Sequence, residues 1–270
     1  MDLTGWIVLN EGPLRLGCFL GIFLIVAALE LLFPKRKPAF SRLKRWPSNL
    51  GVVALNGLFL RVLVPWLAVD AALWADWRDI GLLHAVEMPF WLEIVLAVVI
   101  LDLLIYAQHV VFHLVGPFWR LHRMHHSDLD YDLTTGARFH PIEIVASMLI
   151  KIAAVILLGA PAAGVVIFEI VLNGTATFNH GNLGLPKALD RWLRLVVVTP
   201  DMHRVHHSKI RSETDSNYGF NLPWWDRLFG TYRDQPREGH RKMTIGLGIF
   251  RDSSELRLDR MLRQPFIEPR

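Results

Sequence analysis

Long apolar stretches separated by short polar segments dominate the first two thirds of the chain. Alternation with a period of two is scarce, so strands are not expected. The first stretch has 20 residues, about the length that a helix needs to cross the hydrocarbon core of a bilayer. The pattern therefore predicts an all-α integral membrane protein, with apolar helices over residues 14–33, 50–69, 88–107, 144–158 and 162–178.

The last two stretches are separated by Gly159-Ala160-Pro161, which ends one helix and begins the next. This break predicts a helical hairpin that either crosses the membrane twice or is re-entrant. We therefore predict about four transmembrane helices, counting the pair as one uncertain hairpin. The chain after residue 179 is more polar and rich in turns, which predicts a helical cap at the membrane surface.

Charges in the loops predict the orientation of the chain. The segment 35–45 is strongly basic, whereas residues 75–87 carry more acidic than basic side chains. Because basic loops stay on the cytoplasmic side, the first loop is expected in the cytoplasm and the second outside. Every histidine cluster then meets at the cytoplasmic face. We interpret the basic cluster as a membrane anchor, with a solvated loop as the alternative: Lys35, Arg36, Lys37, Arg42, Lys44 and Arg45.

The composition agrees with a membrane protein. Of 270 residues, 52% are hydrophobic and 20% are charged, against about 25% charged in soluble domains. The net charge of +4 does not indicate nucleic-acid binding, because the densest basic cluster directly follows an apolar stretch. Cys18 is the only cysteine, which excludes an intrachain disulfide and a thiolate metal site. Asp2 and Glu11 stand where a signal peptide would be basic, so no cleavable signal is expected.

The chain contains 12 histidines, and most of them are clustered. His109 and His113 are four residues apart, so they share one face of a helix. Two triplets have the spacing H-x2-H-H, in which the adjacent pair diverges by about 100° on a helix, so that one triplet can serve two metal ions. His180 is a single further candidate at the end of an apolar stretch. The triplets are His122, His125 and His126, and His203, His206 and His207.

More histidines are clustered than one metal ion needs, so two ions are predicted. Imidazole suits zinc, copper, iron and nickel alike, and the ligand type alone leaves the metal open. No H-E-x-x-H motif of zinc proteases occurs, nor the Glu-x-x-His pairs of ferritin-like bundles. Acidic residues are expected to orient the rings, or else to act as caps and turns: Asp102, Asp128, Asp130 and Asp201.

Three histidines lie outside these clusters. His84 and His240 are interpreted as ordinary surface or hydrogen-bonded residues. His140, which precedes Pro141, is expected to have a structural role or to lie near the site. Trp224 and Trp225 are interpreted as packing or interfacial residues, with substrate walls as the alternative.

These motifs resemble the membrane-bound sterol desaturase/fatty acid hydroxylase superfamily over roughly residues 90–235. The similarity extends to Thr134-Thr135, to residues 138–141, 199–203 and 217–219, and to residues 225–232. One departure is the single His180 where some fatty acid hydroxylases have a pair, which is closer to the sterol desaturase and alkylglycerol monooxygenase pattern. The resemblance implies a di-iron centre held by His109, His113, His122, His125, His126, His180, His203, His206 and His207.

The resemblance also implies an enzyme that uses O2 to hydroxylate or desaturate C–H bonds of a membrane lipid. It divides the chain into a transmembrane region (1–89), a catalytic domain (90–235) and a cytoplasmic tail (236–270). No complete G-x-G-x-x-G occurs, because Arg251 stands where the third glycine belongs. Electrons are therefore expected from a separate NAD(P)H-linked electron-transfer protein, which the basic cytoplasmic surface could dock.

Two rival functions remain open from the sequence. A zinc-dependent membrane hydrolase could use a histidine-rich site without consuming oxygen. A metal transporter would place its ligands near the bilayer midplane, whereas these histidines follow the ends of the apolar stretches. No motif identifies the lipid, which could be a sterol, a fatty acyl chain or an alkyl lipid.

Overall fold

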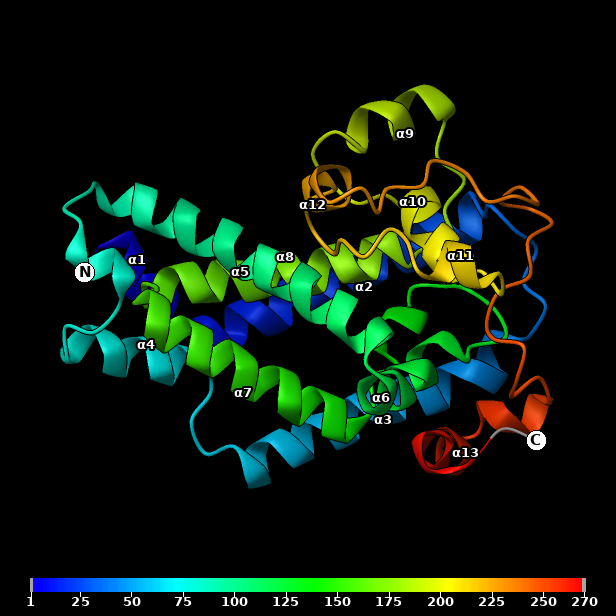
Figure 1. Ribbon diagram of the computed structural model, residues 1–270, viewed down its shortest axis with the longest axis horizontal. Coiled ribbons are helices and arrows are strands. Elements are labelled where there is room, and N and C mark those ends of the chain that lie inside the picture. Colours follow the sequence, from blue (N-terminus) through cyan, green and yellow to red (C-terminus); the bar gives the residue numbers. More distant parts are fainter. Residues whose placement is uncertain (1, 269–270) are drawn as a thin grey trace.

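The computed structural model describes residues 2–268, and every regular element in that part of the chain is a helix (Figure 1). Five helices are long and run roughly side by side: α2 (Glu11–Leu32), α3 (Arg42–Leu63), α5 (Phe90–Leu114), α7 (Pro141–Leu158) and α8 (Ala162–Asn179). The shorter α-helices are α1 (Leu3–Leu9), α4 (Ala68–Trp77), α6 (Gly116–His126), α9 (Lys187–Leu193), α10 (Pro200–His206), α11 (Arg211–Thr214), α12 (Trp224–Leu228) and α13 (Leu258–Arg263). Four 3-10 turns complete the set: η1 (Leu82–Ala85), η2 (Thr135–Ala137), η3 (Ser253–Leu256) and η4 (Gln264–Phe266).

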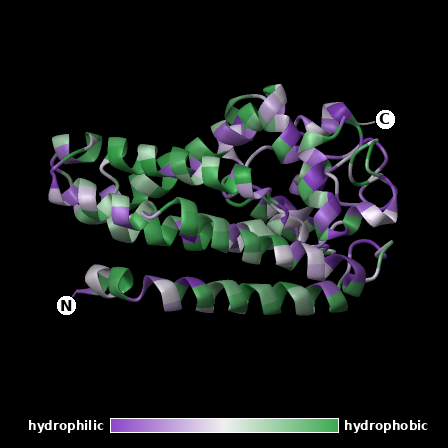
Figure 2. Cartoon of the chain, turned by 90° about the horizontal axis from the view of Figure 1, so that it is seen from below, coloured by the Kyte–Doolittle hydropathy of each residue, from purple (hydrophilic) through white to green (hydrophobic). Residues whose placement is uncertain are grey.

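The long helices form the membrane-embedded part of the protein. Five segments are long and apolar enough to cross a bilayer, and they are Glu11–Leu32, Arg42–Ala85, Phe90–Leu114, Pro141–Leu158 and Ala162–Asn179. Hydrophobic residues cover these helices, whereas hydrophilic residues gather at the other end of the molecule (Figure 2). The fold is therefore that of an all-α integral membrane protein, as the sequence predicts. The number of complete crossings and the side of the membrane stay predictions.

The predicted break between the last two long helices is present. Gly159 ends α7 in the left-handed conformation with φ of 65°, and Pro161 directly precedes α8. Helices α7 and α8 do not pack along each other, because α4 and α5 contact both of them. Alanines on α4, buried against these neighbours, permit the close approach of the backbones. This arrangement separates α7 from α8 and leaves space between them.

Buried ion pairs fix the polar end of the molecule to the long helices. On α3, Arg45 is 1% exposed and binds two carboxylates, with Nη2 2.7 Å from Asp128 Oδ2 and Nη1 2.5 Å from Asp132 Oδ2. At the end of α2, Glu30 accepts hydrogen bonds from the backbone N–H groups of Leu133 and Asn182. Segments that carry no regular structure are thereby positioned by charged side chains from α2 and α3.

These contacts correct part of the sequence interpretation. The basic cluster was expected to act as a membrane anchor, yet Arg45 is buried in an ion-pair network. Lys35 also forms an ion pair, with Nζ 2.5 Å from Asp201, and Arg36 donates to the carbonyl of His240. Lys37 and Lys44 remain exposed. Partners that lie far away in sequence decide the role of each basic residue, and the local charge pattern could not identify them.

Candidate metal centre

Four helices bring the histidines of the clusters together. The chain turns sharply after α5, and α6 begins at Gly116-Pro117, so that α6 returns against the last turns of α5. The third helix that carries these histidines is α10. Its first turn is capped by Thr199, whose Oγ1 lies 3.3 Å from the Met202 N–H. The fourth is the end of α8, where His180 is the C-cap residue. Residues distant in sequence thus converge on one buried region.

The nine predicted ligands form two groups. Within each group, one ligand atom per residue can be chosen so that all of them lie within 4.8 Å of one another. Group A, as we call it, contains His109, His113, His122, His126 and His206, and group B contains His125, His180, His203 and His207. All nine side chains are buried.

Each triplet is divided between the two groups, as its spacing predicts. On α6, His122 and His126 face group A, while His125 points to group B. On α10 the division is inverted, because His206 belongs to group A while His203 and the following His207 belong to group B. Residues four apart stay together, and the adjacent residue turns by about 100° to the other group.

Hydrogen bonds fix the protonation of five rings. Nδ1 of His109 lies 2.7 Å from the carbonyl of Tyr218, and Nδ1 of His206 lies 2.7 Å from the carbonyl of Ser216. Nδ1 of His180 is likewise 2.8 Å from the carbonyl of Ala176. A carbonyl only accepts, so each Nδ1 carries the proton and donates. The lone pair of each of these neutral rings is then on Nε2.

Two further rings are oriented by carboxylates. His122 Nδ1 is 2.7 Å from Glu143 Oε1, and His113 Nδ1 is 3.1 Å from Asp215 Oδ1. Histidines that bind metals typically donate their other ring nitrogen to a carboxylate or a backbone carbonyl. Five of the nine rings have such a partner at Nδ1, three of them a carbonyl and two a carboxylate.

Ring nitrogens of neighbouring histidines point at one another at short distances. Nε2 of His109 is 3.1 Å from Nε2 of His122, and Nε2 of His180 is 3.1 Å from Nε2 of His203. When Glu143 is ionised, His122 donates through Nδ1 as His109 does, and neither Nε2 of this pair has a proton to donate. Two ligands about 2.1 Å from one ion and at right angles would be roughly 3.0 Å apart. The spacing therefore fits a shared cation.

Burial keeps these rings neutral and able to bind a metal. Desolvation lowers the pKa of His122 to about 3 and that of His180 to about 4. It lowers the pKa of His125, His126, His203, His206 and His207 well below the usual value. Both ring nitrogens of His207 and Nε2 of His206 are buried without a hydrogen-bond partner in the described chain. Buried imidazoles that lack partners are what a metal centre requires.

Of the two roles that the sequence left open for four aspartates, the structure favours a structural role over the orientation of rings. Asp102, Asp128, Asp130 and Asp201 make no hydrogen bond to a histidine of either group in the described part of the chain. Asp102 accepts from Trp225 Nε1, and Asp130 accepts from the Ala39 N–H. Asp128 binds Arg45, and Asp201 pairs with Lys35. The partners that the sequence missed, Glu143 and Asp215, are reached only through folding, and no local spacing marks them.

A loop after α11 supplies two of the orienting carbonyls. Asp226 on α12 accepts the N–H groups of Tyr218 and Gly219 at 2.8 and 2.9 Å. A Cβ atom on Gly219 would lie 2.9 Å from Asp226 Oδ2, so only glycine permits this approach. The motif at 217–219 and the one at 225–232 are thus parts of one structure, which holds the carbonyls facing His109 and His206.

The remaining histidines lie outside both groups. His140 is the N-cap of α7, where Nδ1 accepts from the Ile142 N–H at 3.2 Å, so its role is structural. His84 lies beside Asp79, and His240 lies beside Asp201. Trp224 donates to the carbonyl of Leu195 and Trp225 to Asp102, which favours packing over a substrate wall.

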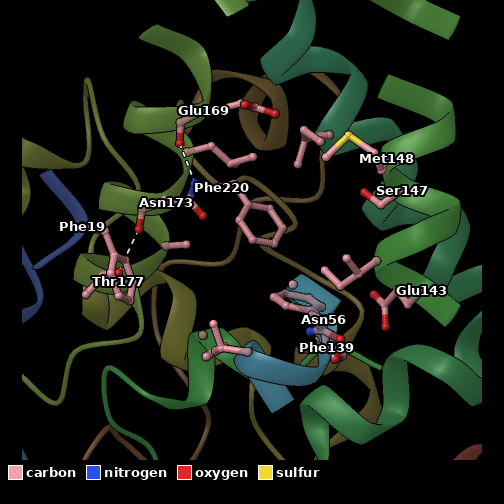
Figure 3. A pocket seen from close by; sticks show the side chains of 18 of the residues that line it. Phe19, Asn56, Phe139, Glu143, Ser147, Met148, Glu169, Asn173, Thr177 and Phe220 are labelled. Carbon is pink, nitrogen blue, oxygen red and sulfur yellow. Dashed lines mark hydrogen bonds between the residues drawn. The ribbon is translucent and has the colours of Figure 1, made fainter. Parts of the chain in front are cut away.

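A cavity of about 460 Å³ opens between the long helices and reaches group A (Figure 3). His109 and His122 are the histidines of the two groups among its lining residues. Helices α2, α3, α5, α7 and α8 all contribute to the wall, which is largely apolar. Phe220 projects into the centre of the view, and Phe139 stacks on His125 with ring centroids 4.5 Å apart. An apolar channel thus ends at the candidate metal centre.

Comparisons with known proteins identify the family. The family model for fatty acid hydroxylases matches residues 94–231, about half of the chain. This match contains all nine histidines of the two groups. The chain belongs to the fatty acid hydroxylase family, within the sterol desaturase/fatty acid hydroxylase superfamily.

The curated relatives of the chain are named as a lipid hydroxylase or as monooxygenases. The chain is similar to ornithine lipid hydroxylase OlsE of Rhizobium tropici, with 32% identity over 151 residues, covering 56% of this chain and 45% of the relative. It is similar to alkylglycerol monooxygenase of Homo sapiens, with 30% identity over 147 residues and coverages of 53% and 30%. It is also similar to alkylglycerol monooxygenase of Xenopus tropicalis, with 30% identity over 195 residues, covering 68% of this chain and 41% of the relative. The chain spans less than half the length of each of these relatives. No solved structure matches it significantly.

Proposed function

We propose that the protein is an O2-dependent, di-iron oxidoreductase that hydroxylates a C–H bond of a membrane lipid. One observation carries the proposal: an apolar cavity between membrane-embedded helices reaches the histidines of group A. Such a cavity lets a hydrocarbon chain approach a metal centre without contacting water. Hydroxylation is favoured over desaturation because the relatives are named as a hydroxylase and a monooxygenase.

Iron fits the donor set of this site. All donors in the two groups are imidazoles, which suit iron, and there are enough of them for two ions. Two bound iron ions would supply the capacity to activate O2 and to oxidise an unactivated C–H bond, for which no acidic or basic side chain suffices. The balance is conventional: one oxygen atom enters the lipid, and two electrons and two protons convert the other to water.

The residues of the chain would bind the two ions and keep the substrate cavity apolar. Five histidines of group A and four of group B would hold the ions, with Glu143 and Asp215 orienting His122 and His113. Phe139 packs against His125 and contributes to the cavity wall, so it separates group B from the space that receives the chain. The aromatic and aliphatic wall orients the lipid by shape, since it offers few free hydrogen-bonding groups.

The proposed reaction consumes two electrons for each molecule of lipid that is hydroxylated. We propose a separate NAD(P)H-linked electron carrier, docking on the cytoplasmic side where the basic residues Lys37 and Lys44 are exposed. The orientation follows from the basic loop before α3 and the acidic segment after α4. Both would be tested by reconstituting the protein with a candidate carrier and by mapping which side of a vesicle is accessible to protease.

The direct test of the metal is elemental analysis of purified protein in detergent or nanodiscs. The proposal expects iron at about two ions per chain and uptake of O2 when lipid and electrons are supplied. Zinc in place of iron, together with lipid cleavage and no O2 uptake, would instead identify a hydrolase. Transport is disfavoured by the position of the histidines, which lie at the ends of α5 and α8 rather than at mid-span.

A further inference from the structure

Away from the histidines, the cavity wall carries charged side chains, which together with Glu11 form a cluster of four that we call the ionic floor. Lys151 Nζ on α7 lies 2.7 Å from Glu169 Oε1 on α8, and Arg15 on α2 binds Glu169 Oε2. Arg15 Nη2 also lies 3.2 Å from Glu11 Oε2. Arg15, Lys151 and Glu169 all line the cavity. Two cations and two anions therefore compensate each other, and the floor carries no net charge.

Lys151 and Glu169 of the floor lie deep among apolar helices, whereas the side chains of Arg15 and Glu11 are 25% and 35% exposed. Lys151 is in the middle of α7, and Glu169 is in the middle of α8. Lys151 and Glu169 are 8% and 7% exposed. Ionisable side chains inside membrane helices are costly and typically mark functional positions. No part of the metal centre explains these charges, because neither group of histidines contacts them in the described chain.

The distance from the metal centre to the floor follows from the geometry of α7. Glu143, which contacts His122, and Lys151 are eight residues apart on this helix. At about 1.5 Å per residue, that separation is roughly 12 Å. In Figure 3, Glu169 lies at one end of the cavity, while Glu143 and Asn56 lie at the other. An extended alkyl chain advances about 1.25 Å per carbon along its axis, so about nine or ten methylenes would fit in this length.

The polar side chains along the wall offer little to a polar ligand. Gln108 Nε2 donates to Ser147 Oγ at 2.9 Å, and Asn173 Nδ2 donates to the carbonyl of Glu169 at 2.8 Å. Thr177 Oγ1 donates to the carbonyl of Asn173 at 2.8 Å. Because these groups already bond to one another or to the backbone, the space between the histidines and the floor suits hydrocarbon. Asn56 Oδ1 and Glu143 Oε2, which are free within the described part of the chain, lie at the end of the cavity away from Glu169.

We infer that the ionic floor closes the substrate cavity and sets the maximum length of hydrocarbon that can extend beyond the reacting carbon. A terminal methyl group can contact the floor but cannot pass it, because the long side chains of Lys151 and Glu169 meet there and occupy the space, and their ion pair holds them in place. The inference rests on the proposed function in one respect, which is that the reacting carbon lies beside His109 and His122. It names Arg15, Lys151 and Glu169 as determinants of specificity for chain length.

The test shortens two side chains of the floor without leaving a charge unpaired. The double variant Lys151→Ala with Glu169→Ala removes one cation and one anion together and leaves Arg15 paired with Glu11. The matched control, Lys151→Met with Glu169→Met, removes the same charges but retains most of the side-chain length. A third pair, with leucine at both positions, has side chains of intermediate length. A graded series remains informative if one variant does not fold.

The readout is binding rather than turnover. A homologous series of n-alkanols is added to the protein in nanodiscs, and the rise in Tm is recorded against chain length. For the wild type, stabilisation should grow with length and then stop at a limit. The limit should move by about three or four carbons in the alanine pair, by less in the leucine pair and hardly at all in the methionine pair, following the length of side chain removed.

Two results would overturn the inference. An unchanged length limit in the alanine and leucine pairs would show that the chain end does not reach the floor. An equal loss of binding at all lengths, in the methionine pair as well, would show that the charges bind a polar group of the ligand. Because alkanol binding needs neither iron nor O2, these outcomes are distinct from a failure of the proposed hydroxylase activity.

Discussion

At the scale of single residues, the site depends on which nitrogen of each ring carries the proton. Carbonyls of Tyr218, Ser216 and Ala176 and the carboxylates of Glu143 and Asp215 hold five rings with Nε2 free. Gly136 permits the packing around one of them, because a Cβ there would lie 2.9 Å from His180 Nδ1. Ring orientation is therefore determined before any ion binds.

Replacing Glu143 by alanine should weaken metal binding without removing a ligand. The His122 ring would lose its acceptor at Nδ1 and with it the preference for a free Nε2. Loss of such a partner typically lowers metal affinity or activity by about 10- to 100-fold. Metal titration of the purified variant would measure the change. The metal affinity of Glu143→Gln, which keeps an acceptor oxygen, should fall less. Equal losses of affinity in both variants would contradict an orienting role.

Two histidines that are both buried should respond in opposite ways to substitution. His122→Ala should abolish most metal binding in group A while the helices still form. His140→Ala removes the N-cap of α7 and should cost about 1 kcal/mol of stability, with metal content unchanged. Metal analysis and thermal unfolding of the two variants separate these effects. Loss of metal from the His140 variant would place that residue in the site after all.

At the scale of elements, the short helices are positioned by buried charges rather than by apolar packing alone. The segment after α6 is held by Arg45 through Asp128 and Asp132, and Arg138 adds a hydrogen bond from Nη2 to Ser127 Oγ at 3.0 Å. The His125 and His126 end of α6 is thereby attached to α3. The element that carries three of the nine histidines depends on this network.

Substituting Arg45 by methionine should be strongly destabilising. Two buried carboxylates would lose their main partner, and breaking a buried pair in this way costs about 3–5 kcal/mol. Thermal unfolding in detergent gives the measurement. Lys44→Met, at the neighbouring exposed position, is the control and should change stability by less than about 0.5 kcal/mol. Similar stabilities for the two variants would rule out the network as a structural determinant.

Sequence patterns predict those features that depend on neighbours along the chain. Apolar length predicts the long helices, Gly159 and Pro161 predict the break, and the spacing of His122, His125 and His126 predicts their division between two ions. The pairing of Glu143 with His122 and of Arg45 with Asp128 joins residues 21 and 83 positions apart. Such contacts depend on how helices pack, so the sequence offered Asp102 and Asp201 as ring partners or caps, missed Glu143, and favoured a membrane anchor for Arg45.

At the scale of the whole molecule, hydrophobic and histidine-rich parts meet at one end of a cavity. The membrane-embedded helices do more than anchor the chain, because five of them enclose the space that reaches His109 and His122. The ionic floor closes the other end. A lipid chain placed between them would have its reacting carbon at the metal centre and its end at Lys151 and Glu169.

The proposed reaction at this centre is the transfer of one oxygen atom from O2 to a lipid. The most direct measurement supplies isotopically labelled O2 to the iron-loaded protein with lipid and an electron donor, and determines the mass of the product. The expected product is heavier by one labelled oxygen atom, with the second labelled atom in water. A product whose added oxygen comes from water, or a lipid that is cleaved without incorporating label, would contradict it.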